Sequence, residues 1–308
     1  MKRLGLATVA LTAAAGLASH ADAARFVLTA NNYIYNGSFA DAGATTAERE
    51  IRINGASVNA RSPSIAFSSN GTLYATLNAN SSGGLPGGLN HGLYTVNNFA
   101  SATTAEFTLV TSMANNTPSF DFVGSGANER LIGVRQGGNP GSSTFISSAA
   151  GDFSSINQNV GATGVAAAFP STGWTGSQYI GVTGGGNEAN RLFYTVDINT
   201  GAASALLDGS NTQIALTFSS DPYGTIALSG GDFAGGDYYI SFYSNALQKA
   251  IIGTVDLSNG LFTEVARFDV NGNPPTAMGL AVVIPSPLAG GIGVAGLMFV
   301  GARRRRNA

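Results

Sequence analysis

The sequence predicts an all-β protein, and more specifically a β-propeller of about five four-stranded blades. Gly fills 42 of the 308 positions and only 10% of the residues are charged. This composition indicates many turns and few long surface helices. With 44% hydrophobic residues, a chain of this length carries enough apolar surface for a folded core.

A pattern of four short strands recurs along the chain. In its clearest copy the strands span residues 64–67, 72–77, 92–97 and 106–110. The first strand of each copy ends at Phe67, Phe122, Phe169, Phe218 and, in the last copy, about Ala281. Successive end residues are 55, 47, 49 and about 63 positions apart. Four strands at this interval are typical of propeller blades, each of which is a small antiparallel sheet.

The first strand of each copy is predicted to be the innermost strand of a blade, which places innermost strands at 166–169 and 214–218. The last copy retains only residues 277–282. The segments 25–29, 32–36 and 50–53 supply its missing strands, and closure of the ring in this way removes exposed sheet edges. The alternative fold is a β-sandwich, or a pair of them, which the same density of strands permits.

The repeat resembles that of secreted propellers that carry Gly-x-Leu-Tyr, then Leu-Tyr-x-Val-Asp, then Thr-Gly. Gly71-Thr72-Leu73-Tyr74 and the segment 192–201 carry the resemblance. It implies a propeller body over residues 24–283.

The first 23 residues are typical of a signal peptide. Lys2 and Arg3 precede an apolar stretch from Leu4 to Leu17, and the small residues Ala21 and Ala23 flank the expected cleavage site before Ala24. We therefore expect export by the Sec machinery.

The other end, residues 284–308, carries a second targeting feature. Its parts are Pro285, Ser286 and Pro287, then an apolar run of 15 residues from Leu288 to Ala302, then Arg303, Arg304, Arg305 and Arg306. A helix over this run is about 22 Å long at about 1.5 Å per residue, against a hydrocarbon core of about 30 Å, so the arginines must snorkel to help it span. The arginines should remain cytoplasmic and the body outside.

These three features resemble the PEP-CTERM sorting signal of Gram-negative bacteria, in a variant with Ser286 where the family usually has Glu. The resemblance implies recognition by an exosortase, transient anchoring through the C-terminal apolar helix, removal of the tail, and residence in the cell envelope, at the cell surface or in the extracellular matrix. A plain single-span anchor is the alternative.

Charge and composition exclude several function classes. Residues 24–285 contain nine basic and 16 acidic residues, a net charge of about −7, so no nucleic-acid partner is expected. Cys is absent, which excludes disulfides and thiolate chemistry. His91 is the only histidine beyond residue 23, so a His-based metal cluster or triad is not supplied, and we interpret it as a solvated loop residue.

Acidic turns at 197–201, 256–260 and 269–273 place oxygen ligands at alternate positions, as calcium loops do. None continues to the Glu that closes such a loop, so Asx-turns explain them better. Paired carboxylates could still perform acid/base chemistry, and the candidates on strands or Gly-rich loops are Asp121, Glu129, Glu188, Asp232 and Asp237. No catalytic residue, metal or cofactor is assigned from these patterns.

Two functions therefore remain open. The first is a non-catalytic surface or extracellular-matrix protein that binds polysaccharide or another surface protein through Trp174, Tyr238 and Tyr239, because these rings offer large contact areas at low entropic cost. Buried packing is the alternative interpretation of Tyr239. The second function is a secreted glycoside hydrolase or lyase that uses two carboxylates.

Overall fold

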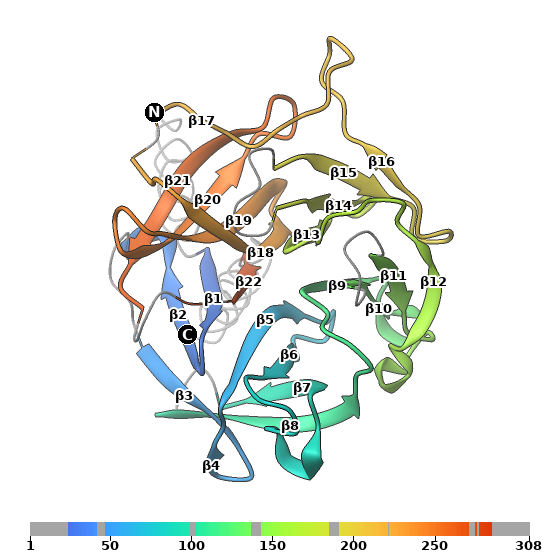
Figure 1. The fold of residues 1–308 in the computed structure, drawn as a ribbon, viewed down its shortest axis with the longest axis vertical. Coiled ribbons are helices and arrows are strands. Elements are labelled where there is room, and N and C mark those ends of the chain that lie inside the picture. Colours follow the sequence, from blue (N-terminus) through green and yellow to red (C-terminus); the bar gives the residue numbers. More distant parts are fainter. Residues whose placement is uncertain are drawn as a thin grey trace, which may run out of the picture.

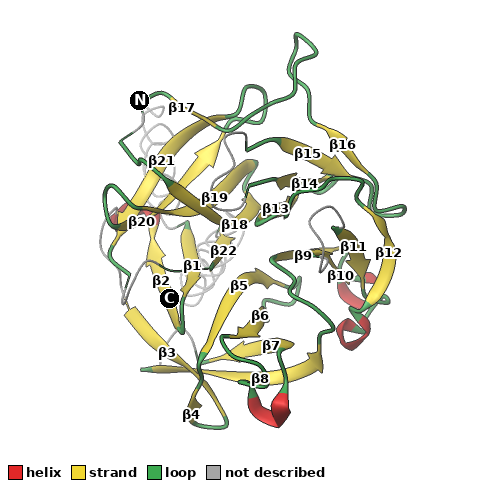
Figure 2. Ribbon diagram, in the orientation of Figure 1, coloured by secondary structure: helices red, strands yellow, loops and turns green. Residues whose placement is uncertain are grey.

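The computed structural model describes residues 24–41, 47–98, 103–136, 143–184, 191–220, 222–270, 275 and 277–284. Small antiparallel sheets stand around a central axis and form a five-bladed β-propeller, which confirms the predicted fold class (Figure 1). The predicted signal peptide and the predicted tail with its apolar helix lie outside the described residues. The helical segments that are described are short 3-10 turns, and none is long and apolar enough to cross a membrane (Figure 2).

Each blade is numbered from its innermost strand outward. Blade 1 comprises β22 (Met278–Val283), β1 (Arg25–Ala30), β2 (Tyr33–Ser38) and β3 (Ala47–Ile53), with the short β4 (Ala56–Ser57) paired to β3. Blade 2 comprises β5 (Ala60–Phe67), β6 (Leu73–Ala79), β7 (His91–Asn97) and β8 (Thr104–Ser112). Blade 3 comprises β9 (Ser119–Val123), β10 (Arg130–Arg135), β11 (Thr144–Ser147) and β12 (Gln158–Ala162).

Blade 4 comprises β13 (Ser171–Trp174), β14 (Tyr179–Val182), β15 (Phe193–Val196) and β16 (Ala203–Ala205). Blade 5 comprises β18 (Ile226–Ala234), β19 (Asp237–Ser244), β20 (Lys249–Val255) and β21 (Leu261–Phe268), and β17 (Thr217–Phe218) adds an outer parallel strand to β21. The 3-10 turns are Phe39–Asp41, Pro86–Gly88, Gly126–Asn128 and Phe153–Ser155.

The two ends of the described chain close the ring within blade 1. Strand β1 pairs with β22 in an antiparallel register that runs from Arg25 opposite Val283 to Ala30 opposite Met278. The predicted role of the N-terminal strands in completing the last blade is therefore confirmed. The backbone hydrogen bonds between β1 and β22 join the two ends of the described chain in one blade. Neither strand is therefore left with an unpaired edge at this junction.

Blades 1 and 2 are also joined at their outer edges, which the sequence did not predict. Strand β3 pairs with β8 in parallel, with Glu50 opposite Thr104 and Arg52 opposite Glu106. The two blades thus form one continuous sheet at the periphery. This pairing covers two edges that would otherwise offer unpaired backbone groups to other chains.

Two innermost strands lie elsewhere than predicted. In blade 4 the innermost strand is β13, directly after the predicted segment 166–169, and Phe169 is fully buried beneath the blade. In blade 5 it is β18, while Phe218 belongs to the outermost strand β17. Both predictions were wrong because they followed the large apolar residues, whereas the axis accepts small ones.

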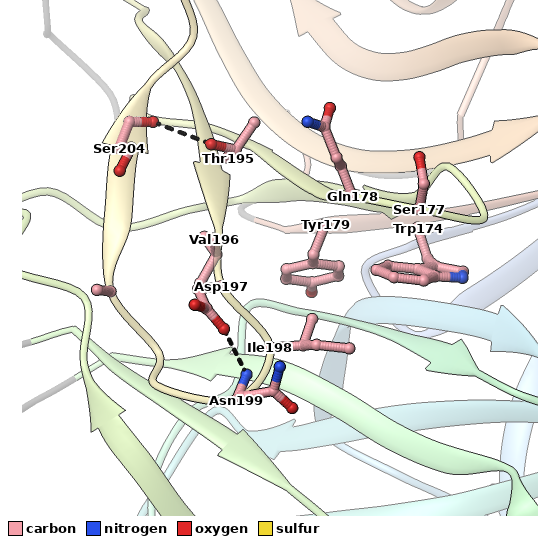
Figure 3. A pocket seen from close by; sticks show the side chains of 11 residues that line it. Trp174, Ser177, Gln178, Tyr179, Thr195, Val196, Asp197, Ile198, Asn199 and Ser204 are labelled. Atoms are coloured by element: carbon pink, nitrogen blue, oxygen red, sulfur yellow. Dashed lines mark hydrogen bonds between the residues drawn. The ribbon is translucent and has the colours of Figure 1, made fainter.

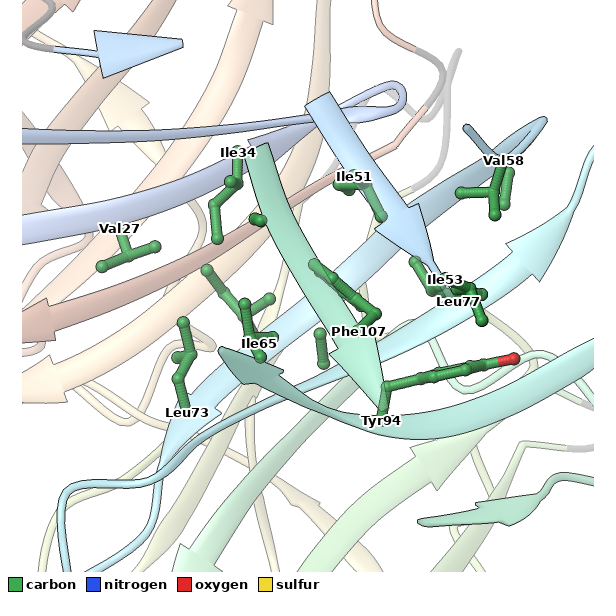
Figure 4. Packing of buried hydrophobic residues seen from close by; sticks show 14 of the residues in the cluster. Val27, Ile34, Ile51, Ile53, Val58, Ile65, Leu73, Leu77, Tyr94 and Phe107 are labelled. Atoms are coloured by element: carbon green, nitrogen blue, oxygen red, sulfur yellow. The ribbon is translucent and has the colours of Figure 1, made fainter. Parts of the chain in front are cut away.

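Five buried clusters, one between each pair of neighbouring blades, form the hydrophobic core of the described residues. Alternate side chains of one strand serve two clusters. In β1, Val27 packs between blades 1 and 2, whereas Phe26 and Leu28 pack between blades 1 and 5. Figure 4 shows the cluster between blades 1 and 2, where Ile34 and Ile51 meet Ile65 and Leu73. We call each of these inter-blade clusters a seam. Because successive side chains of a strand point to opposite faces of its sheet, each blade contributes to two seams, and the core is a ring of five.

At the axis the innermost strands approach each other through glycines. A Cβ added to Gly279 would lie 2.9 Å from backbone atoms of Ser64 and Ile65 in blade 2. One added to Gly230 would lie 2.5 Å from the backbone nitrogen of Leu280 in blade 1. Real Cβ atoms do not tolerate such contacts, so the diameter of the ring depends on glycine at these positions.

Gly279→Ala should therefore destabilise the propeller. We expect a loss of about 1–3 kcal/mol from overpacking of the seam, which corresponds to roughly 2–4 °C of melting temperature per kcal/mol for a domain of this size. Thermal unfolding followed by circular dichroism measures it. Gly209→Ala is the matched control, because no atom lies within 4 Å of its added Cβ. Equal melting temperatures for the two variants would contradict the proposed tightness of the axis.

Candidate functional site

The innermost strands of three blades share a short motif near their start, Pro-Ser with an aromatic residue three positions after the Ser. The copies are Pro63 to Phe67, Pro118 to Phe122 and Pro170 to Trp174. In each copy the Ser side chain bonds to another blade or to the connection that leads into it. Ser64 Oγ accepts from Phe120 N, Ser119 Oγ donates to the Phe169 carbonyl, and Ser171 Oγ bonds the Tyr238 hydroxyl. The spacing of Pro-Ser pairs, 55 and 52 residues, is a signal that sequence reasoning missed.

The residues at the start of the innermost strands line a cavity of about 330 Å³ at one end of the axis, which we call the axial funnel. Every blade contributes to it. The contributions include Met278 from blade 1, Arg61 from blade 2, Pro118 from blade 3, Pro170 from blade 4 and Ser229 from blade 5. Because the motif positions each strand start in the same way, the funnel follows directly from the repeat.

One side of the funnel carries a chain of hydrogen-bonded side chains. His91 Nδ1 lies 2.9 Å from Asn78 Oδ1, Asn78 Nδ2 donates to Asn116 Oδ1, and Asn116 Nδ2 lies 3.5 Å from Gln136 Oε1. Asn78 is buried, whereas Gln136 at the other end is exposed. The chain crosses from blade 2 to blade 3 and holds the amides in a defined orientation.

The electrostatics of the funnel come from Arg61 and the neighbouring His91. Burial is the main cause that lowers the pKa of His91, and the positive charge of Arg61 lowers it further. The imidazole is therefore neutral at neutral pH, so that one ring nitrogen can donate to Asn78. His91 begins β7 and is half-buried, so the interpretation as a solvated loop residue was wrong.

Two of the five candidate carboxylates come together deeper along the axis. Asp121 in β9 and Asp232 in β18 occupy the same position in their repeats. Each lies three residues beyond the funnel, roughly 10 Å at about 3.3 Å per residue. Asp121 accepts from Phe122 N at 2.7 Å and from Trp174 N of blade 4 at 2.6 Å.

Asp232 repeats this arrangement two blades further round. It accepts from Phe233 N at 2.7 Å and from Val282 N of blade 1 at 2.6 Å. Each carboxyl thus bonds its own strand and the next innermost strand. The equivalent positions in the other blades hold Ala66, Gly173 and Ala281, so this carboxyl link between innermost strands occurs at two of the five blade junctions.

The environment of the axial acids favours their neutral forms. Each side chain is half-buried, but the surrounding protein is dense enough that desolvation dominates its protonation. Desolvation, and then repulsion from Asp232, raises the pKa of Asp121 well above its usual value. Desolvation raises the pKa of Asp232 to about 6 despite its two backbone donors. Two nearby phenols, Tyr179 and Tyr238, stay neutral because burial raises the pKa of each.

The remaining candidate acids do not join this pair. Glu129 is buried and accepts from the backbone and hydroxyl of Ser69, which ties blade 3 to blade 2. Asp237 is exposed at the start of β19, and Glu188 lies outside the described residues.

Of the three aromatic residues predicted to bind a ligand, Trp174 borders a cavity. It ends β13 and is half-buried beside a pocket of about 400 Å³. As Figure 3 shows, its indole ring lies near the buried ring of Tyr179 and above Ile198, with Gln178 and Asn199 nearby. Because Pro170 at the other end of the strand lines the funnel, this pocket lies at the opposite end of blade 4. Binding by Trp174 stays a prediction.

The two tyrosines lie in the core, where burial leaves little of either ring accessible to a ligand. Both belong to strand β19, and Tyr238 is 1% exposed while Tyr239 is 7% exposed. The Tyr239 ring stacks on Phe39 with centroids 5.4 Å apart. Apolar neighbours on β1, β2 and β22 bury Tyr239, and neighbours on β14 and β15 bury Tyr238. All of them are remote in sequence from β19.

The acidic turns are Asx-turns where the structure describes them. Asp197 Oδ1 accepts from Asn199 N at 2.8 Å, and Asp256 Oδ1 accepts from Ser258 N at 2.8 Å. These bonds lower the pKa of both carboxyls. Within the described ranges, no three His, Asp or Glu side chains gather as a metal site would require. Most of the third turn, 271–273, lies outside those ranges.

No family model and no curated protein matches the chain. Among solved structures, it is similar to an exo-β-1,3-galactanase from Phanerochaete chrysosporium bound to galactose, with a TM-score of 0.53, 11% identity, and coverage of 82% of this chain and 67% of the other. The likeness shows the fold. A protein of unknown function from Bacteroides caccae has a TM-score of 0.46 at 10% identity, with coverage of 85% of this chain and 99% of the other. RS223-β-xylosidase has a TM-score of 0.43 at 11% identity, with coverage of 68% of this chain and 77% of the other.

The axial acids should make stability depend on pH. A carboxyl whose pKa is raised on folding confers stability that is present below its unfolded pKa of about 4 and is lost as the pH rises through its folded value, here about 6 for Asp232. The free energy of unfolding should fall by about 1.4 kcal/mol per pH unit in this window. Asp232→Asn should flatten the dependence while lowering stability at pH 5, because an amide accepts only one of the two N–H donors.

Urea unfolding between pH 4.5 and 7.5 measures this effect. Asp208→Asn is the control, because hydrogen bonds to Thr212 and Ser210 lower the pKa of that exposed acid and its contribution changes below the window. An unchanged slope in Asp232→Asn would show that other groups cause the dependence.

Proposed function

We propose that this chain is a carbohydrate-binding propeller whose ligand site is the axial funnel. The observation that carries the proposal is the convergence of all five blades on a cavity lined by oriented amides, an arginine and proline rings. Its volume of about 330 Å³ falls within the range of about 300–1,000 Å³ that small-ligand sites occupy.

The chemistry of the funnel suits a polyhydroxylated ligand. Amide groups such as those of Asn116 and Gln136 offer both donors and acceptors, which match the hydroxyls of a sugar ring. Pro63, Pro118 and Pro170 supply rigid apolar surface between them. The galactanase with the same fold acts on β-1,3-linked galactan, so we propose galactans among the first ligands to test.

A glycan array probed with the purified full-length chain tests the proposal, followed by calorimetry on the best ligand. Gln136→Ala should weaken binding about fivefold, the worth of one hydrogen bond of about 1 kcal/mol. Gln158→Ala is the matched control, an exposed glutamine on the outer strand β12 of the same blade. Absence of binding across the array, or equal effects of both variants, would overturn the proposal.

Hydrolysis of a glycosidic bond is the second candidate function. The axial pair favours it, because two carboxyls with separately raised pKa values can act as acid and base. The fold comparison also supports this alternative more than a purely non-catalytic role. Release of reducing sugar from β-linked galactan should then be lost in both Asp121→Asn and Asp232→Asn. Release that persists in the folded double variant would exclude these acids as the catalytic pair.

We also propose that the chain is exported and sorted to the cell envelope, with the Sec machinery and an exosortase-type enzyme as partners. The support is the arrangement of Lys2 and Arg3, the Pro285-Ser286-Pro287 motif and the four terminal arginines. Mass spectrometry of the surface fraction should find a mature N-terminus at Ala24 and a C-terminus near Pro287. A surface form that retains Arg303 would show an anchor in place of a processed signal.

A further inference from the structure

Arg61 brings to the funnel a positive charge that no hydrogen bond or ion pair within the described residues neutralises. It lies in β5 at the funnel and is half-buried, and within the described ranges its guanidinium makes no hydrogen bond or ion pair. Several other described cations are paired, as in Arg52 with Glu50 and Lys249 with Asp269. Arg130 is half-buried and likewise makes no hydrogen bond or ion pair within the described ranges, but it lies away from the funnel. A half-buried guanidinium without a partner gives up part of its hydration and gains nothing in return.

No described acid lines the funnel, although the body as a whole is acidic. His91 is a titratable neighbour of Arg61: burial is the main cause that lowers its pKa, and the positive charge of Arg61 lowers it further. Asp121 and Asp232, deeper along the axis, are engaged by backbone donors. The funnel is therefore a positively charged site in a negatively charged protein, which favours an anion there and disfavours one elsewhere.

The chain of amides adds donors at the same place. Since Asn78 donates to Asn116 and Asn116 donates to Gln136 Oε1, the Nε2 group of Gln136 keeps its hydrogens for an acceptor in the funnel. Arginine binds carboxylate and sulfate through two parallel N–H bonds, which a neutral hydroxyl cannot match. Both groups thus point to an acceptor that carries negative charge.

We propose that the funnel selects an acidic glycan, with the carboxylate of a uronic acid unit or the sulfate ester of a sugar bound by Arg61 and the Gln136 amide. This inference rests on the proposed function, since it names the class of glycan that the same site takes. It makes Arg61 the residue that determines specificity, while the prolines and remaining amides hold the sugar ring.

Calorimetry on the full-length chain with three probes tests the inference: oligogalacturonate, a sulfated galactan oligomer, and a neutral β-1,3-galactan oligomer. One acidic probe should bind at least about tenfold more tightly than the neutral one, and its affinity should fall as NaCl rises. The better of the two acidic probes distinguishes carboxylate from sulfate.

The Arg61→Gln variant should weaken the acidic probe about tenfold and change the neutral one less than about threefold. Arg61→Lys should be intermediate, because it keeps the charge and loses the paired geometry. Arg130→Gln is the matched control, a half-buried arginine at the start of β10 away from the funnel. Circular dichroism confirms that each variant is folded.

Equal affinity of the wild-type chain for acidic and neutral probes overturns this inference and leaves the proposed function standing. Equal losses in Arg61→Gln and Arg130→Gln overturn it as well, because the effect is then one of net charge. No binding of any probe overturns the inference and the proposed function together.

Discussion

The structure depends on the close approach of five innermost strands around one axis. At Gly279 and Gly230 the backbones of neighbouring blades leave no space for a Cβ. This constraint sets the diameter of the ring, and the diameter in turn decides how the apolar faces of the blades meet in five seams. Because the chain has no Cys, these seams and the closure of β1 on β22 must stabilise the ring without disulfides.

The axial carboxyls show how the ring handles polar groups at its centre. Small innermost residues leave the backbone N–H groups of Trp174 and Val282 facing the seams, where they need acceptors. Asp121 and Asp232 satisfy them, but the same burial raises the pKa of each acid. One pair of side chains therefore links neighbouring blades, makes the stability sensitive to pH, and holds two protonatable groups on the axis of a fold that a glycosidase shares.

The two cavities differ in chemistry. The funnel end is rich in hydrogen-bond donors and positively charged through Arg61, whereas the pocket beside Trp174 combines an indole ring with Gln178 and Asp197. The segments at the start of the innermost strands build the first, together with residues near the ends of β6, β10 and β14. The hairpin turns of blade 4 build the second. A propeller of this kind can present different surfaces to different ligands without any change in its core.

The all-β class, the number of blades and the closure by the N-terminal strands could be predicted from the amino-acid sequence, because these follow from local strand patterns and their interval. So could the Asx-turns at Asp197 and Asp256, whose bonds span two residues. Which strands line the axis became clear from the folded arrangement, since close packing between blades, rather than strand propensity, requires small residues such as Gly230 there. The folded arrangement likewise decided that Asp121 and Asp232, 111 residues apart, share one axis, and that Tyr238 is buried while Arg61 faces a cavity. Those facts depend on distances between blades, which no local pattern records.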